Sequence, residues 1–505
     1  MSSWDWNNRK KDADARGMAG GPVVAIKPRI LYFAPKEFWP PDTGGKVRNY
    51  NLAREMTAYA DVTYLAFSDG SDTPVAESVW LRGEGYYRHR LKSADLEKQK
   101  GEFERIVTVG RKPGYRLSKI LLGAFGRTPI TVLNYTTPEM SRCLANILGE
   151  GDFDIVHMAG LHLSAYLPLI REAKSKPAVV CDWHNVESEL MQRYSEHAPS
   201  VAHRAYALTT ARRLRHLERR AIGQFDYHTV VSARDQARLL EIDPLAPVHI
   251  VENGVDVDRY RDPALECAYY TARLPRNTMS GAKRLADGLS EVERRRILFV
   301  GSMDYRANED AAVYFAHEVW PQLRRRWRRL EFTIVGRRPS QRLKGLSRIE
   351  GVEVTGTVHD VRPYYREAIA AVVPLRIGGG SRLKILEAMA AGVPVVSSTL
   401  GAEGLEVTDA KNIMLADSPA EFIRALSLVC EDGGVWRMLS VSGRDLADLK
   451  YSWGTVGREC EELHQRILDA RWTPIQRKEP VPVVVSSSPD WPITAHCVQE
   501  HGKIG

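Results

Sequence analysis

The sequence predicts an α/β protein built from two doubly wound domains, each with its own parallel sheet. Three observations support this prediction. The chain has 505 residues, more than one hydrophobic core usually organises. Short apolar runs, which are typical of buried strands, alternate with stretches of helical character. A polar and poorly patterned segment, residues 256–293, separates two series of these runs and contains the expected linker.

The first series opens in the order strand, glycine loop, helix, strand. The apolar run 30–34 predicts the first strand, a loop with two glycines follows at 44–45, and residues 47–60 have helical spacing. The second strand is expected at residues 62–67. Further buried strands are expected at 154–158, 178–182, 227–232 and 248–252, and a long arginine-rich helix at 204–222.

The second series repeats this alternation. Its first strand begins at Arg296, and helical spacing follows at 310–325. Further strands are expected at 332–336, 352–356, 371–375 and 393–397. The chain then divides into a disordered lead-in (1–28), a first domain (29–255), the linker region (256–293), a second domain (294–452), a final helix (453–470) and a loose tail (471–505).

Composition narrows the class of protein. The formal net charge of +8 suits nucleic acid, an anionic membrane or phosphorylated substrates, and no nucleic-acid motif appears. No apolar run reaches the length of about 18 residues that a membrane-spanning helix needs. The six cysteines form no C-x-x-C pair and the N-terminus does not resemble a secretory signal, so we expect reduced thiols and a cytoplasmic protein.

The most informative stretch is IGGGSRLKILEAMAAGVPVVSS, residues 377–398. If Ser381 is the N-cap, the first turn of the following helix offers free N–H groups and the positive end of the helix dipole. The preceding glycines let the backbone approach a ligand closely, and Arg382 and Lys384 add two cations. Glu387 lies farther along the helix and could accept hydrogen bonds from a ribose. The stretch therefore favours a nucleoside diphosphate over the alternative, a glycine-rich turn with solvated cations.

Other nucleotide-binding patterns are absent from the sequence. There is no G-x-x-x-x-G-K-S/T loop, which disfavours an NTPase, and no G-x-G-x-x-G after the first strand, which disfavours a dinucleotide oxidoreductase. Asp152 and Asp154 have the spacing of a metal-binding D-x-D pair, but Asp154 begins a predicted strand, so a surface turn is the better interpretation.

Several motifs together resemble glycosyltransferase family 4, whose members are retaining enzymes of the GT-B fold with two Rossmann-like domains facing across a cleft. The resemblance runs from about residue 29 to residue 468, with gaps in the linker and near residues 70–125, and is nearest to bacterial sugar transferases of exopolysaccharide clusters. The motifs are PPDTGGKVRNYNLA, DWHNVE, NGVD, FVGSMDYRANEDAAVYF, FTIVGRRP, VTGTVHDVRPYY, GGGSRLKILEAMAAGVPVVSS and GAEGL.

The resemblance implies roles for the donor side. Glu387 matches the second glutamate of the family's paired-glutamate motif, which holds the ribose, and the first glutamate is replaced by Gly379. The family's arginine and lysine on the first loop of the second domain are absent, and Ser302 and Asn308 occupy that loop. The expected donor-binding residues are Gly379, Gly380, Ser381, Arg382, Leu383, Lys384, Glu387, Ser302 and Val358, the last of these packing on the base.

The resemblance also implies roles for the first domain. Gly44 and Gly45 match the loop that faces the diphosphate and the acceptor, and Lys46 and Arg48 are expected to reach the same anion. The expected catalytic residues are Gly45 and a histidine near the sugar, for which His157 and His184 are both candidates.

The resemblance implies a mechanism that needs no metal, so we expect none and no other cofactor. The expected activity is that of a hexosyltransferase-like enzyme (EC 2.4) that moves a sugar from a nucleotide-sugar to a saccharide or lipid-linked saccharide, in polysaccharide biosynthesis. The alternatives are a non-catalytic nucleotide-sugar-binding or assembly protein and a GT-B sugar-nucleotide epimerase. Residues 320–332, WPQLRRRWRRLEF, would also allow a peripheral contact with the inner face of a membrane, against the alternative of a solvated helix end.

Overall fold

The computed structural model describes most of both predicted domains. The described residues are 27–39, 41, 43–68, 78–81, 102–111, 129–196, 198, 200–261, 296–378 and 382–472. The expected lead-in up to residue 26, most of the linker region and the tail after residue 472 lie outside this part of the chain. Residues 1–464 form one compact unit, and residues 465–472 are the described part of a second.

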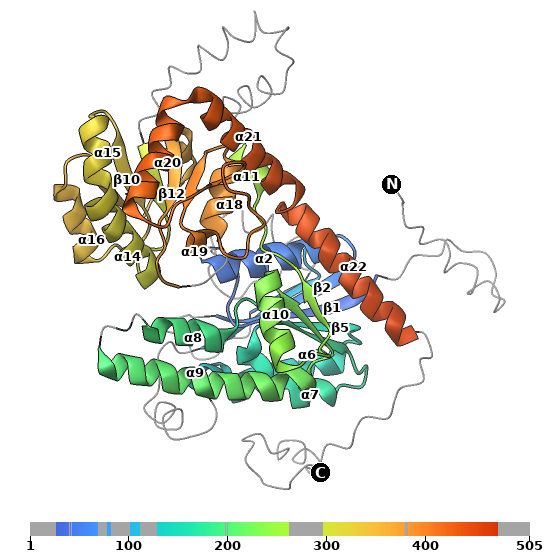
Figure 1. Cartoon of the computed structure of the whole chain (residues 1–505). Coiled ribbons are helices and arrows are strands. Elements are labelled where there is room, and N and C mark those ends of the chain that lie inside the picture. The colour runs from blue at the N-terminus through green and yellow to red at the C-terminus, as the bar shows by residue number, and fades with distance from the viewer. Residues whose placement is uncertain are drawn as a thin grey trace, which may run out of the picture. The chain divides into compact units, whose positions relative to one another are not determined.

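The first sheet has the strand order β3-β4-β2-β1-β5-β6-β7-β8. Figure 1 labels its strands β1, β2 and β5. All neighbouring strands are parallel except β3 and β4, which run antiparallel. The six strands expected from apolar runs are present, and β3 and β4 were not expected. The strands are β1 (Arg29–Ala34), β2 (Asp61–Ser68), β3 (Ser78–Leu81), β4 (Arg105–Gly110), β5 (Ile155–Ala159), β6 (Ala178–Trp183), β7 (Tyr227–Val230) and β8 (Val248–Ile250).

The helices of the first domain begin at recognisable caps. Thr43 caps α2 through a hydrogen bond from the backbone N–H of Lys46, so this helix begins at Gly44, earlier than expected. Ser200 caps the long arginine-rich helix in the same way. The elements are α2 (Gly44–Met56), α5 (Ile130–Tyr135), α6 (Pro138–Glu150), η2 (Leu161–Tyr166), α7 (Leu167–Arg171), α8 (Glu187–Glu196), α9 (Val201–Ala221), η3 (Ile222–Gln224) and α10 (Ala233–Ile242).

The second sheet is parallel throughout, in the order β11-β10-β9-β12-β13-β14. The strand expected at 371–375 begins three residues earlier, because Ala368 already pairs with Arg296 of the first strand. The strands are β9 (Arg296–Val300), β10 (Glu331–Val335), β11 (Val352–Gly356), β12 (Ala368–Val373), β13 (Val395–Ser397) and β14 (Met414–Leu415).

The helix expected at 310–325 is not continuous, because a π-helical segment separates its two α-helical parts. Trp320, at the start of the second part, is fully buried and donates a hydrogen bond to the carbonyl of Glu350, so it is not available to a membrane surface. No helix in the described part of the chain is long and apolar enough to span a bilayer. The elements are α14 (Arg306–Tyr314), η5 (Phe315–Val319), α15 (Trp320–Arg326), α16 (Gln341–Gly345), η6 (Leu346–Arg348), α17 (Arg362–Arg366), α18 (Leu383–Ala390), α19 (Thr399–Ala402), α20 (Pro419–Glu431), α21 (Gly433–Leu449) and α22 (Trp453–Trp472).

The chain passes between the two domains twice, at neighbouring places. Val255 pairs with Ser452 in an isolated bridge, its N–H donates to the carbonyl of Tyr451, and its carbonyl accepts from Trp453. Helix α11 (Val257–Tyr260) follows the first crossing and packs in the core of the second domain. The start of the predicted linker region therefore belongs structurally to the second domain.

Candidate active site

A cavity of about 770 Å³ lies between the two sheets and is lined by residues of both domains. Its lining follows the carboxyl ends of β1, β6, β9, β10 and β12, which is where doubly wound sheets bind ligands. We call it the donor cavity. The lining residues are Lys36, Pro41, Thr43, Gly44, Gly45, Val47, Arg48, His184, Asn185, Leu190, Asn253, Val300, Gly301, Ser302, Asp304, Tyr305, Asn308, Arg337, Arg338, Val373, Leu375, Arg382, Leu383, Lys384, Glu387 and Gly401.

Helix α18 begins one residue later than expected. Its first helical residue is Leu383 and its N-cap is Arg382, which has a left-handed φ of 52° and caps nothing with its side chain. The expectation that Ser381 is the N-cap is therefore wrong. Three of the expected donor-binding residues, Gly379, Gly380 and Ser381, lie outside the described residues.

Lys384, on the first turn of α18, is a half-buried cation of the donor cavity. Its ammonium donates a hydrogen bond to the side-chain oxygen of Asn308 and lies 4.9 Å from the centre of the Phe299 ring. Burial, with a smaller contribution from Arg382, lowers the pKa of Lys384 to about 7. A bound anion would favour the charged lysine, so this side chain is suited to a ligand that brings negative charge.

A glycine makes this arrangement possible. A Cβ at Gly301 would lie 2.7 Å from the side-chain nitrogen of Asn308 and 3.3 Å from the Lys384 ammonium. Asn308 also donates a hydrogen bond to the carbonyl of Ser302 over 2.8 Å, which holds its side chain in place. The loop after β9 therefore positions Asn308 to hold the lysine.

Glu387 lies one turn farther along α18 and is also part of the cavity wall. The hydroxyl of Tyr365 lies 3.4 Å from its carboxylate and donates to it, and Tyr260 of α11 also bonds to it. Burial raises the pKa of Glu387, against these two hydrogen bonds and the charge of Arg259. The carboxylate is thus fixed from two sides at the cavity wall, as a group that accepts hydrogen bonds from a ligand hydroxyl needs to be.

The side chain of Arg382, which was expected to bind the diphosphate, is instead bonded to Glu403. Its Nε donates to the carbonyl of Glu403 over 3.1 Å, and its Nη2 lies 3.5 Å from the Glu403 carboxylate. Burial lowers the pKa of Arg382 to about 10. Arg382 lines the donor cavity, but Glu403 already neutralises part of its charge.

Two cations of this cavity were missed by the sequence analysis. Arg337 donates to the hydroxyl of Ser302 over 2.9 Å, and Arg338 pairs with Asp304 at 3.3 Å. Both follow β10 in the GRRP segment. Their place directly after a buried strand was the signal that could have identified them. The expected residue Ser302 lines the cavity and also donates to Asp304.

On the first-domain side, His184 lines the donor cavity and His157 does not. The Nε2 of His184 lies 3.2 Å from the buried carboxylate of Asp182. A Cβ at Gly45 would lie 3.6 Å from the Nδ1 of His184, so the start of α2 packs closely against this ring. Gly44, Gly45 and His184 are therefore brought together, as the resemblance implied.

Arg48 has a structural role that differs from the expected contact with a diphosphate. Its Nε and Nη2 donate to the two carboxylate oxygens of Asp182 over 2.9 and 2.7 Å. Its other N–H groups donate to the carbonyls of Val251 and Glu252 and to the side-chain oxygen of Asn253. All five N–H groups of the guanidinium are thus used inside the domain. Burial alone would raise the pKa of Asp182, but Arg48 holds it well below its usual value.

Two further expected residues lie beside the donor cavity without forming its wall. Lys46 is half-buried in the first turn of α2. Val358 is half-buried against the core of the second domain, in the loop after β11. The structure brings together the other described donor residues, Arg382, Leu383, Lys384, Glu387 and Ser302.

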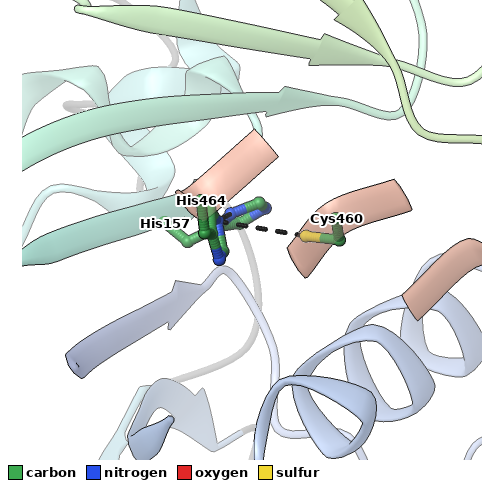
Figure 2. Close-up of side chains that lie close together, drawn as sticks. All are labelled: His157, Cys460 and His464. Carbon is green, nitrogen blue, oxygen red and sulfur yellow. Dashed lines mark hydrogen bonds between the residues drawn. The ribbon is translucent and has the colours of Figure 1, made fainter. Parts of the chain in front are cut away.

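His157 belongs to a buried group with Cys460 and His464 (Figure 2). Its Nδ1 lies 3.3 Å from the Nε2 of His464, which in turn lies 3.9 Å from the sulfur of Cys460. Burial lowers the pKa of His157 to about 4 and raises that of Cys460 to about 12. These are the residues of the described part best placed to hold a metal ion. They offer three ligands where closed zinc sites have four, and none of them lines the donor cavity.

Glu403 joins the two domains at one side of the donor cavity. Its carboxylate pairs with Arg193 of α8 at 2.7 Å and with Arg234 of α10. Arg193 also donates to the carbonyl of Gly378 over 3.4 Å. These residues line a narrow cavity of about 60 Å³, which we call the constriction. The sequence analysis did not identify this group, because its members are far apart in the chain.

Comparison with known proteins agrees with this geometry. Residues 43–259 match the family model described as Glycosyltransferase Family 4, and residues 294–432 match the one described as Glycosyl transferases group 1. The two facing sheets and the cavity between them define a glycosyltransferase of the GT-B fold. The chain belongs to glycosyltransferase family 4.

Solved structures share the fold at low identity. Sucrose-phosphate synthase from Thermosynechococcus elongatus is 16% identical, with a TM-score of 0.59 over 88% of this chain and 100% of that chain. The α,α-trehalose 6-phosphate synthase from Burkholderia multivorans is 14% identical, with a TM-score of 0.55 over 88% and 99%. HepE from Anabaena, in complex with UDP and glucose, is 13% identical, with a TM-score of 0.53 over 86% and 99%. No curated protein sequence matches the chain.

Proposed function

We propose that this glycosyltransferase moves a sugar from a nucleoside-diphosphate sugar to a saccharide or lipid-linked saccharide, with retention of anomeric configuration, in polysaccharide biosynthesis. The observation that carries the proposal is the half-buried Lys384 ammonium, which Asn308 holds one turn from Glu387 in the donor cavity. The likeness to HepE, which was solved with UDP and glucose, supports a donor of this class.

The diphosphate and the ribose of the donor each have a candidate binding group in the donor cavity. Lys384 and the free N–H groups at the start of α18 would bind the diphosphate, and Arg337 and Arg338 add positive charge from the loop after β10. Glu387 would accept hydrogen bonds from the ribose hydroxyls. The diphosphate leaves with additional charge, so preorganised cations at this place stabilise the transition state more than the bound donor.

The reaction forms one bond and breaks one. The acceptor hydroxyl oxygen bonds to the anomeric carbon on the face from which the diphosphate leaves, and the bond from that carbon to the diphosphate oxygen breaks. The hydroxyl proton passes to the departing diphosphate. His184, oriented by Asp182 beside Gly45, would contact the sugar or the acceptor. The charges that this step needs are supplied by side chains, so we propose that it requires no metal ion.

A non-catalytic nucleotide-sugar-binding protein is the second candidate. It is favoured by two departures from the family pattern, Gly379 in place of the first glutamate and Ser302 in place of the loop arginine. In that case the donor cavity would bind nucleotide without turnover.

Thermal unfolding with UDP, GDP, ADP, CMP, dTDP and their common sugars tests the donor site. A ligand present at about 100 times its Kd stabilises the folded protein by about 2.7 kcal/mol. We expect one nucleotide to raise the Tm of the wild type and of Lys344→Ala, an exposed lysine outside the donor cavity, but not of Lys384→Ala. The same shift in all three proteins would contradict the proposed site.

Measuring turnover distinguishes the proposed glycosyltransferase from the non-catalytic binding protein. We expect the nucleotide-sugar that raises the Tm to be hydrolysed slowly, and Glu387→Ala to abolish this activity. NMR of the transfer product would show the anomeric configuration of the donor. Tight binding without hydrolysis or transfer to any acceptor would favour the non-catalytic protein.

A further inference from the structure

A second cavity, of about 750 Å³, lies between helices α8, α9 and α10 and the second-domain segments around Ile377 and Leu400. Six arginines and four glutamates line it, and none of its described lining residues is aromatic. We call it the arginine cavity. The charged residues are Arg193, Arg212, Arg215, Arg234, Arg238, Arg376, Glu189, Glu196, Glu241 and Glu403.

Four of the six arginines are neutralised by partners. Arg193 and Arg234 pair with Glu403 and Glu189. Arg238 pairs with Glu241 at 2.8 Å, and Arg376 pairs with Asp310, which is not part of the lining. These side chains form part of the cavity wall, and most of their positive charge is compensated by the ion pairs.

The other two arginines are not held in ion pairs, although Arg215 interacts electrostatically with the buried Glu218. Arg212 and Arg215 are exposed on α9 and form no ion pair with any residue that the structure describes. They lie three residues apart, on the same helix face as Leu208 and Ala211, which also line the cavity. Two neighbouring guanidinium groups on one cavity wall can bind a phosphate oxygen pair, because their planar N–H groups match its geometry.

The arginine cavity is next to the donor cavity. The constriction shares Arg193, Glu189, Arg234 and Glu403 with the arginine cavity. It shares Asn185, Leu190, Asn253 and Arg382 with the donor cavity. A saccharide held in the arginine cavity would therefore have to reach the donor cavity past the ion pairs of Arg193, Arg234 and Glu403.

We propose that the arginine cavity is the acceptor subsite and that it takes a saccharide bearing a phosphate or diphosphate group, held by Arg212 and Arg215. This rests on the proposed function, since the acceptor hydroxyl attacks the sugar of the donor. The phosphate group takes no part in the bond exchange and serves only to hold the acceptor. Both a soluble sugar phosphate and a saccharide linked to a lipid through diphosphate carry this chemistry.

A binding measurement tests the proposal without turnover. Inorganic diphosphate is titrated calorimetrically into protein whose donor cavity is saturated with the nucleotide found by thermal unfolding. We expect Arg212→Gln/Arg215→Gln to weaken binding at least about tenfold. The control is Arg219→Gln/Arg220→Gln, which removes two charges from exposed positions of the same helix outside the cavity lining. Equal binding in the wild type and the cavity variant, or equal weakening in both variants, would overturn the proposal.

A failure of the proposed function would give a different experimental result from a failure of the acceptor subsite. If no nucleotide binds, the donor site fails, and the same two variants are compared in Lys384→Ala protein without nucleotide. A difference between them there would still support an anion site in the arginine cavity. No difference there would overturn it.

Transfer assays then identify the source of the phosphate. Three acceptors with the same sugar are compared: the free saccharide, its phosphate ester, and the saccharide on a short-chain lipid diphosphate. We expect at least one phosphorylated acceptor to exceed the free saccharide in kcat/KM, and this preference to disappear in Arg212→Gln/Arg215→Gln but not in the control. Whichever phosphorylated acceptor loses its preference is the source. No preference for either phosphorylated acceptor in the wild type, or a preference that is equally large in the wild type and the cavity variant, would overturn the proposal.

Discussion

The ammonium of Lys384 and the side-chain oxygen of Asn308 are hydrogen bonded across the floor of the donor cavity. The two residues come from the first turns of α18 and α14, so both belong to the second domain. The cation that we propose for the donor diphosphate is therefore held by a residue of its own domain.

Replacing Gly301 tests this contact. In Gly301→Ala the new Cβ would lie 2.7 Å from the Asn308 side-chain nitrogen, which must move and lose its bond to the Ser302 carbonyl. We expect donor affinity to fall about tenfold, the loss of one hydrogen bond to a charged group. Calorimetric titration with the donor nucleotide measures the loss, and Tm measures the fold. Gly345→Ala is the control, because a Cβ there meets nothing within 4 Å. Unchanged affinity in Gly301→Ala would show that Asn308 does not position the lysine.

Nucleotide binding is expected to take up a proton. The pKa of Lys384 is about 7 in the free protein, because the side chain is buried and faces Arg382, with Glu387 opposing the shift. A bound diphosphate raises it. Below pH 7 the lysine is already charged, whereas above pH 7 binding must add the proton, so affinity falls by up to about tenfold per pH unit.

Calorimetry at pH 8 in buffers of different ionisation enthalpy counts this proton. At that pH the diphosphate is already ionised, so the protein is the acceptor of the proton. Lys384→Arg keeps the charge at all pH values and should abolish the uptake. Identical uptake in the wild type and in Lys384→Arg would assign the proton to another group.

The buried pair of Arg48 and Asp182 is expected to support stability and not donor binding. Arg48→Met leaves the carboxylate of Asp182 without its main partner, with only Thr229 donating to it and His184 nearby. Removing one member of a buried pair costs about 3–5 kcal/mol. Chemical denaturation measures this loss, and Arg48→Met/Asp182→Leu should recover part of it. Donor Kd in the folded fraction should stay unchanged, and a large increase would instead support the diphosphate contact expected from the sequence.

We expect replacement of the two candidate histidines to have different effects on catalysis and on stability. His184 faces the donor cavity, so His184→Asn should lower kcat by about 10² or more with little change in Tm. His157 is fully buried and stacks on Tyr32 at 5.1 Å, so His157→Asn should lower Tm. Its kcat per folded molecule should remain near that of the wild type. The reverse pattern would place the catalytic group at His157.

Much of the fold was predictable, because buried parallel strands are short apolar runs. Ile30 to Ala34 in β1 and Phe332 to Val335 in β10 are such runs, and both were expected. β3 and β4 were not expected, and both lie in the stretch near residues 70–125 where the family resemblance has a gap. The break in the helix expected at 310–325 did have a local signal, Pro321, which follows the π-helical segment in the first turn of α15 and has no backbone N–H to donate.

The lining of the donor cavity was predictable where residues are neighbours in sequence, as Lys384 and Glu387 are. It was not predictable where the partner comes from a distant segment. Asp182 and the carbonyls that bind Arg48 lie more than 130 residues away from it in the sequence. Glu403 contacts Arg382 because the chain folds back between them, which residue spacing does not reveal. In each case charge was visible in the sequence, but whether that charge faces a ligand or another side chain was not.

The paired crossings at Val255 and Ser452 give the two domains one joint instead of two. Because each crossing is hydrogen bonded to the other, they must turn together, and a swing of either domain bends both at the same place. Gly254 stands at this joint with the Trp453 ring so close that a Cβ would lie 2.6 Å from it. A methyl group there would press on the Trp453 ring, and we expect it to change how the two domains move relative to each other.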